Sequence, residues 1–195
     1  MRKALLKSLI LFLVLIFPSF QNSTIPKSFN LHFIQLSNTH SDQWAMVFGE
    51  SGDEEFWSVQ QTSDGSYVIA GSTDPFGPRP WDFWVIKLDQ KGKIQWEKTY
   101  GLESTSEMAY SIQKTNDGGF VLAGVINGLG NDIDEKGSDI LVIKLDENGN
   151  ILWENAYGAL GWDWPGYTDS IQQTTDGGYI VTGYTSTWEG AVKIF

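Results

Sequence analysis

Runs of apolar and β-branched residues between short polar turns dominate the chain after its N-terminal segment. YVIAGST from Tyr67 and FWVIKLD from Phe83 are examples, and Asp-Gly or Lys-Gly turns adjoin them. Such runs predict β-strands joined in hairpins. The run from Phe83 is almost continuously apolar, which predicts a strand that is covered on both faces. The spacing of an amphipathic helix does not occur after the N-terminal segment, so the pattern predicts an all-β fold.

Two phrases alternate along the chain and define a repeat. The first begins at Ser58 (SVQQTSDGSYVIAGST) and returns at Ser111 (SIQKTNDGGFVLAGVI) and Ser170 (SIQQTTDGGYIVTGYT). The second begins at Val85 (VIKLDQKGKIQWEKTYG) and returns at Val142 (VIKLDENGNILWENAYG). The spacings of 53 and 59 residues for the first phrase and 57 for the second are typical of repeat architectures.

Each repeat is predicted to contain four strands. A short first strand at 58–62 or 111–115 leads into an Asp-Gly turn, a strong hairpin signal because both residues tolerate a positive φ. The fourth strand carries a tryptophan, which we interpret as a wedge against the neighbouring sheet because an aromatic ring buries a large area. The predicted structural positions are Trp44, Trp96 and Trp153 for the wedge, Asp64, Asp117 and Asp176 for the first turn residue, and Gly65, Gly118 and Gly177 for the second.

These units predict an all-β, β-propeller-type repeat of four-stranded antiparallel blades. The chain holds about three blades' worth of strands, and closed propellers have four or more. We therefore expect an incomplete or open form: a truncated chain, a ring built from several chains, or an open stack. The predicted divisions are an N-terminal segment at 1–23, a degenerate half-blade at 24–49, blade repeats at 50–100 and 101–157, and a truncated blade repeat at 158–195, whose AVKIF aligns with VIKL.

The N-terminus has the pattern of a secretory signal. Arg2, Lys3 and Lys7 precede the apolar stretch SLILFLVLIF, which begins at Ser8. Ten apolar residues are too few to span a bilayer, which needs about 20. Residues 1–23 therefore predict export to the cell surface or beyond, with a membrane anchor through residues 4–20 as the alternative. The chain contains no cysteine, so disulfides are excluded.

The charge of the chain limits its partners. It carries 24 acidic and 13 basic residues, for a formal net charge of −11. Phosphate backbones and anionic membrane surfaces repel such a protein, so nucleic acid and membrane partners beyond the N-terminal segment are excluded. Protein and carbohydrate partners are compatible with it. Self-association through open edge strands is a further expectation, because unpaired edges attract other strands.

The two phrases together resemble a known family. The pattern S-I-Q-x-T-x-D-G-G followed by K-L-D-x-x-G-x-x-x-W is similar to the tandem blades of secreted prokaryotic β-propeller proteins, and it runs from about Leu31 to Phe195. The L-D-x-x-G-x-x-x-W half also resembles the tryptophan-docking motif of quinoprotein propellers. This resemblance implies an extracellular repeat scaffold. It implies no catalytic residues.

Several tryptophans outside the repeated positions neighbour an acidic residue. An aromatic face beside a carboxylate suits a sugar, because it combines stacking with hydrogen bonds to hydroxyl groups. The alternative is that these rings fold back and cover the edges of the blades. The candidate binding residues are Trp81, Asp82, Trp162, Asp163, Trp164 and Trp188.

An acidic cluster in the second full repeat is a candidate calcium site, because Ca²⁺ prefers carboxylate oxygens from flexible loops. The alternative is a solvated charged loop. The candidate metal-binding residues are Asp132, Asp134, Glu135 and Asp139.

Signals of catalysis are weak. His32 and His40 are the only histidines, and neither a zinc motif nor a nucleophile elbow occurs. We therefore expect a non-catalytic binding scaffold without a cofactor, with a glycan-active enzyme that uses loop carboxylates, or a fragment without a function of its own, as the alternatives. The segments 71–84, 101–110, 125–139 and 158–169 are predicted to be the loops that present the binding surface.

Overall fold

The computed structural model describes residues 31–35, 44–49, 52–74, 81–102, 105–127, 137–158 and 161–186. Every secondary-structure element in these ranges is a β-strand, which confirms the prediction of an all-β chain. The predicted signal or anchor at 1–23, and the chain from residue 187 onward, lie outside the described residues. Within the described ranges there is no helix of the length and apolar character that a membrane span requires.

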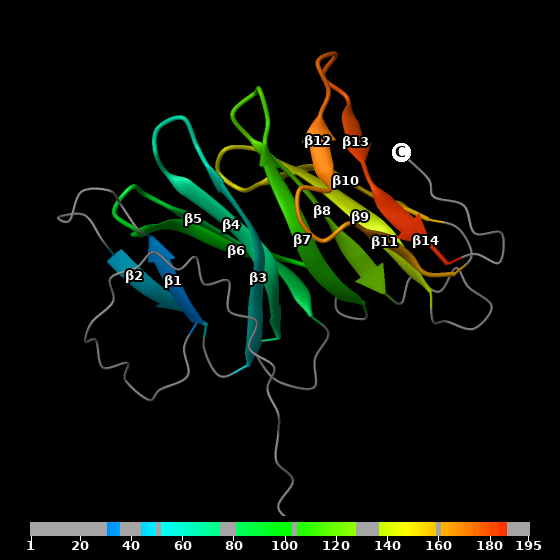
Figure 1. Ribbon diagram of the computed structural model, residues 1–195, viewed down its shortest axis with the longest axis horizontal. Coiled ribbons are helices and arrows are strands. Elements are labelled where there is room, and N and C mark those ends of the chain that lie inside the picture. Colours follow the sequence, from blue (N-terminus) through cyan, green and yellow to red (C-terminus); the bar gives the residue numbers. More distant parts are fainter. Residues whose placement is uncertain are drawn as a thin grey trace, which may run out of the picture.

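Two four-stranded antiparallel sheets form the centre of the molecule (Figure 1). The first contains, in this order, β3 (Asp53–Gln61), β4 (Tyr67–Asp74), β5 (Asp82–Leu88) and β6 (Ile94–Tyr100). The second contains, in the same order, β7 (Ser106–Lys114), β8 (Phe120–Asn127), β9 (Ser138–Leu145) and β10 (Ile151–Tyr157). The prediction of four-stranded antiparallel sheets is therefore confirmed for the two full repeats.

Shorter strand pairs lie on either side of the two sheets (Figure 1). The hairpin of β1 (Leu31–Gln35) and β2 (Trp44–Phe48) precedes the first sheet. After the second sheet come β11 (Asp163–Pro165) paired with β14 (Gly183–Thr185), and β12 (Ile171–Gln173) paired with β13 (Tyr179–Val181). β11 and β12 together take the place of a first strand. We call β3, β7 and the β11–β12 segment the leading strands.

The apolar runs are buried on both faces, as the run from Phe83 predicts. Phe83 and Val85 of β5 pack in the core between the two sheets, whereas Trp84 and Ile86 pack in a second core with Phe48 of the β1–β2 hairpin. The second sheet is buried in the same way, between the first sheet on one side and β12 and β13 on the other. Each full sheet is thus an inner layer of a stack, which explains why its strands do not alternate between apolar and polar residues.

Repeated serines join neighbouring leading strands. The Ser58 hydroxyl of β3 accepts a hydrogen bond from the backbone N–H of Ile112 at 3.2 Å. One repeat later, the Ser111 hydroxyl of β7 accepts one from the N–H of Ser170 at 3.1 Å. These are the residues with which the repeated phrase begins, so part of the phrase serves to hold the units together.

The leading strands are longer than the sequence predicts. The predicted first strands, 58–62 and 111–115, are the second halves of nine-residue strands that begin at Asp53 and Ser106. Each contains a register shift, between Phe56 and Ser58 in β3 and between Ala109 and Ser111 in β7. The extra residue shifts the alternation of side chains between the two faces of the sheet. The first half of the strand therefore does not continue the period-two pattern from which the strand was predicted.

The predicted binding loops are correspondingly shorter. Five strands, β4, β5, β7, β8 and β9, extend into the segments 71–84, 101–110 and 125–139, and β11 lies within 158–169. Most of the described residues in these predicted loops therefore belong to β-strands. The reason is that the strands continue past the glycine that ends each apolar run.

Candidate functional site

Aromatic residues occupy the register shift in each leading strand. Trp57 is the extra residue of β3 and Tyr110 that of β7. In the third unit the single residue is replaced by the segment between β11 and β12, which contains Tyr167. We call these three places the bulges.

A glycine opposite each bulge permits the close approach of the two strands. Gly71, Gly124 and Gly183 pair with the last residue before the bulge in their unit. A Cβ atom on Gly71 would lie 1.8 Å from the carbonyl oxygen of Glu55, and one on Gly124 would lie 2.2 Å from that of Met108. Only glycine fits at such a distance, so the repeated A-G or T-G of the second strand is a requirement of the bulge.

The bulge residues of successive units are in contact. Ring centroids lie 5.6 Å apart for Trp57 and Tyr110 and 5.2 Å apart for Tyr110 and Tyr167. Trp164 stacks on Tyr110 at 5.9 Å, and Tyr184 stacks on Trp164 at 6.5 Å. These five residues are called the aromatic cluster. They come from three units and four separate stretches of sequence.

The cluster has a buried base and an exposed rim. Tyr110 is 3% exposed, whereas Tyr167 and Tyr184 are 58% and 51% exposed. Trp57 and Trp164 are intermediate. The Trp164 Nε1 atom is buried without a hydrogen-bond partner among the described residues. Exposed aromatic rings that gather in one place are typical of a surface that a ligand or partner covers.

Glu55 adds negative charge to the aromatic cluster. Burial raises the pKa of the Glu55 carboxyl, and the charge of Asp53 raises it further. Burial also raises the pKa of Tyr110, with smaller contributions from Tyr167, Glu55 and Tyr184. The Tyr110 phenol is therefore protonated at neutral pH, and Glu55 is close enough for its charge to act on it.

The structure places the predicted aromatic and acidic binding residues in different environments. Trp81 is half-buried, and its carbonyl oxygen accepts a hydrogen bond from the N–H of Glu107 at 2.6 Å. Asp82 begins β5, and burial raises the pKa of its carboxyl. Trp162 is 45% exposed, whereas the neighbouring Asp163 is 1% exposed. Trp188 lies outside the described residues.

Of the predicted binding residues that the structure describes, Trp164 is the one that belongs to the aromatic cluster. The predicted binding residues do not include the other four members of the cluster, which are Trp57, Tyr110, Tyr167 and Tyr184. A signal was present: an aromatic residue stands directly before the repeated serine at both Trp57-Ser58 and Tyr110-Ser111.

The predicted calcium site is mostly outside the described residues. Asp132, Asp134 and Glu135 lie there, and Asp139 is part of β9. In the portion of the chain that is described, no group of three or more acidic, histidine or cysteine side chains is arranged to hold a metal ion.

A pair of carboxyl groups meets at the junction of the two sheets. A Cβ atom on Gly101 would lie 2.0 Å from Asp82 Oδ1 and 2.8 Å from Glu107 Oε2, so both groups approach the same point. Glu107 is 1% exposed, and its Oε2 has no hydrogen-bond partner among the described residues. Burial, together with the charges of Asp82 and Glu154, raises the pKa of Glu107 to about 7. Asp139 and Asp163 approach Gly158 in the same way one unit later.

The predicted structural positions form the turns and the sheet junctions. Gly65, Gly118 and Gly177 have φ values of 80°, 86° and 89°, and each follows its turn aspartate. Trp96 packs against the core between the two sheets, and its Nε1 donates a hydrogen bond to the carbonyl oxygen of Glu147 at 3.2 Å. Trp153 packs against Tyr179 with ring centroids 5.5 Å apart. Trp44 belongs to β2, and its side chain is outside the described part.

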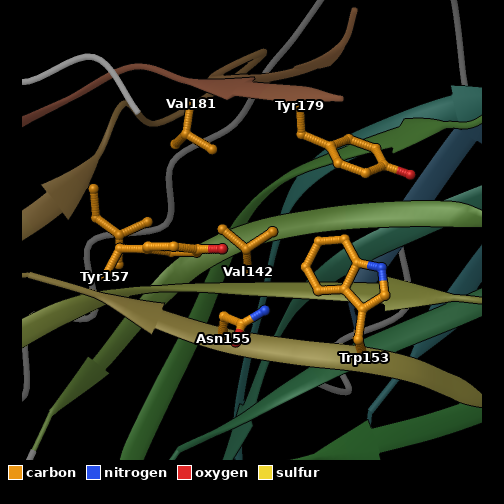
Figure 2. Close-up of a pocket in the computed structure, with 7 residues that line it drawn as sticks. Val142, Trp153, Asn155, Tyr157, Tyr179 and Val181 are labelled. Carbon is orange, nitrogen blue, oxygen red and sulfur yellow. The ribbon is translucent and has the colours of Figure 1, made fainter. Parts of the chain in front are cut away.

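An apolar hollow of about 270 Å³ lies beside β10 and β13. Figure 2 shows Trp153, Tyr157 and Val142 of the second sheet facing Tyr179 and Val181. At the first junction the residue equivalent to Tyr157 is Tyr100, which is buried and donates a hydrogen bond to the Gly149 carbonyl oxygen at 2.8 Å. The hollow thus occupies a core position of the repeat, and we place the candidate site at the aromatic cluster instead.

No family model matches the chain, and no curated protein matches it.

Proposed function

We propose that the protein is a non-catalytic, exported scaffold of the β-propeller type that binds carbohydrate through the aromatic cluster. The observation that carries the proposal is the convergence of aromatic residues from three successive units on one partly exposed place. Core packing alone does not require the rings of Tyr167 and Tyr184 to remain at the surface.

The blade arrangement is supported by the way the sheets stack. Each full sheet runs from its leading strand outward in chain order, and successive sheets cover one another face to face. The leading strands β3 and β7 lie side by side in Figure 1 and are joined by the Ser58 hydrogen bond. Leading strands that gather on one side while later strands fan outward are typical of propeller blades.

Carbohydrate is the ligand that the cluster fits best. The apolar faces of sugar rings stack on aromatic side chains, and their hydroxyl groups need donors and acceptors beside those faces. The cluster offers exposed faces at Tyr167 and Tyr184 and an exposed acceptor at the Glu55 carboxyl. Export is supported by the signal-like pattern of residues 1–23.

A glycan array followed by calorimetry tests the proposal. We expect the protein to bind a subset of oligosaccharides. Tyr167→Ser should weaken that binding about tenfold, equivalent to about 1.4 kcal/mol. Tyr157→Ser is the matched control, because Tyr157 is also exposed but lies outside the cluster. Absence of binding to every glycan, or equal effects of the two variants, contradicts the proposal. Cleavage of the bound glycan would instead identify a glycan-active enzyme.

A further inference from the structure

The acidic residue of the aromatic cluster is particular to the first unit. Glu55, Met108 and Trp164 each stand two residues before the bulge residue or segment of their unit, next to the residue that pairs with the close-approach glycine. One unit therefore contributes a carboxylate where the others contribute a thioether and an indole ring. The cluster is negatively charged on one side only.

This negative charge lacks a cationic counterpart in the described structure. Among the described residues, the ion pair that forms joins Lys144 to Asp117, at the turns of the second unit. Glu55 is exposed, and the charge that acts on its carboxyl is that of another acid, Asp53. A carboxylate with a like charge beside it is stabilised when a cation binds.

We propose that the aromatic cluster binds carbohydrate that carries a protonated amine, an amino sugar, with the ammonium group at Glu55 and the sugar face on Tyr167 and Trp57. The inference rests on the carbohydrate-binding function proposed above and names its ligand class. An ammonium group gains twice here, because it neutralises the carboxylate and also interacts favourably with the faces of nearby aromatic rings. The charge of −11 on the chain attracts cationic oligosaccharides over a longer range.

The chemistry of the site disfavours the other charge classes. A sugar acid would bring a second or third carboxylate next to Glu55 and Asp53, which is unfavourable at short distance. A neutral sugar would remove water from the exposed Glu55 carboxylate without supplying a counter-charge, which costs free energy. The order of affinity expected is therefore amine-bearing, then neutral, then acidic sugars.

Two oligosaccharides with the same skeleton test this order. The probes are a tetramer of β-1,4-linked glucosamine and its fully N-acetylated counterpart, titrated by calorimetry into the full chain at low and high salt. We expect the amine tetramer to bind about tenfold more tightly at low salt and to lose most of that advantage at high salt. Glu55→Gln should reduce the advantage to about twofold or less. Glu147→Gln, which removes an exposed acid in the turn between β9 and β10, is the matched control and should leave the advantage unchanged.

A second variant at Glu55 separates loss of the carboxylate from loss of the fold. Glu55→Met places in the first unit the residue that the second unit carries at the same position, Met108, so the fold tolerates it. It should abolish the preference while leaving the thermal transition unchanged. Equal binding of both tetramers by the unmodified chain, or an unchanged preference in both Glu55 variants, overturns the inference but leaves carbohydrate binding standing. Failure of both tetramers and of every neutral glycan overturns the proposed function as well.

Discussion

The turns of the leading strands are built in the same way in every unit, whereas the bulges differ from one unit to the next. At the turns, the threonine hydroxyl bonds to the carboxylate two residues later in all three units, at Thr62, Thr115 and Thr174. The turn glycine N–H donates to the carbonyl oxygen of the same threonine at 2.9 to 3.0 Å. At the bulges the aromatic residue is Trp57, Tyr110 or Tyr167, and its partner is different each time.

The difference separates what the fold needs from what is free to vary. A hairpin turn has one solution that satisfies its backbone groups, so each copy of the repeat retains Thr, Asp and Gly. A bulge needs a glycine on the opposite strand but allows any side chain that points away from the sheet. Variation at a place where neighbouring units meet is typical of a recognition surface on a rigid scaffold. The following predictions test that division, from the largest expected effect to the smallest.

Alanine at the bulge glycine should destabilise the protein more than alanine at a turn glycine. A Cβ atom on Gly124 would lie 2.2 Å from the Met108 carbonyl oxygen and 2.3 Å from Phe83 Cζ, so Gly124→Ala should cost about 3 kcal/mol. Gly118→Ala should cost about 1 kcal/mol, because its φ is +86° but the space around it is open. Urea denaturation of both variants measures the difference in the free energy of unfolding. A larger loss of stability for Gly118→Ala would contradict the prediction that the bulge glycine matters more than the turn glycine.

Replacing a turn aspartate should destabilise the protein more when its lysine partner is more deeply buried. Lys144 is 3% exposed, and its Nζ lies 2.9 Å from Asp117 Oδ2. Asp117→Asn leaves that ammonium group buried beside a neutral amide and should cost about 2 kcal/mol. Asp64→Asn should cost less, because the equivalent Lys87 is only partly buried. Equal losses in chemical denaturation would show that the ion pair contributes little.

Glu107 and Asp117 should make the stability of the protein depend on pH in opposite directions. The folded pKa of Glu107 is raised from 4.5 to about 7, so the stability that it contributes is present below pH 4.5 and is lost as the pH rises through 7. The folded pKa of Asp117 is lowered from 3.8 to about 2, chiefly by the Thr115 hydroxyl and Lys144, so its contribution is present above pH 3.8 and is lost as the pH falls through 2.

Thermal unfolding across this range provides the measurement. Glu107→Gln should remove the decline of the melting temperature between pH 4.5 and 7, since the amide does not ionise. The acid side of the profile should be unchanged in this variant. A decline that persists in Glu107→Gln would assign it to Asp82, whose pKa is also raised by burial.

Removal of the Thr115 hydroxyl from the turn should have the smallest effect on stability. Thr115 is buried and bonds to Asp117 at 2.5 Å. Thr115→Val keeps the shape of the side chain and removes the bond, so it should cost about 1 kcal/mol. Chemical denaturation with Thr115→Ser as the control measures it. A loss as large as that of Gly124→Ala would mean that the turns, too, are sensitive to long-range packing.

The turns could be predicted from the sequence because the physics that determines them is local. Asp117 and Gly118 specify a hairpin through their own backbone preferences and through hydrogen bonds that span two to four residues. The covered strands could also be predicted, since the run from Phe83 has no polar face. The first halves of the leading strands could not, because the extra residue at Trp57 or Tyr110 inverts the alternation on which the prediction depends.

The aromatic cluster depended on the tertiary structure. From the sequence alone, the all-β class, the repeat and its turns could be inferred, since each depends on residues within one unit. The meeting of Trp57 with Tyr167 joins the first unit to the third, and it exists because the sheets stack with their bulges at the same height. The relative position of the first and third units depends on how each unit packs on the next, and the sequence of a single unit does not determine it. Tertiary packing therefore decided which of the many aromatic residues form a site and which fill the cores.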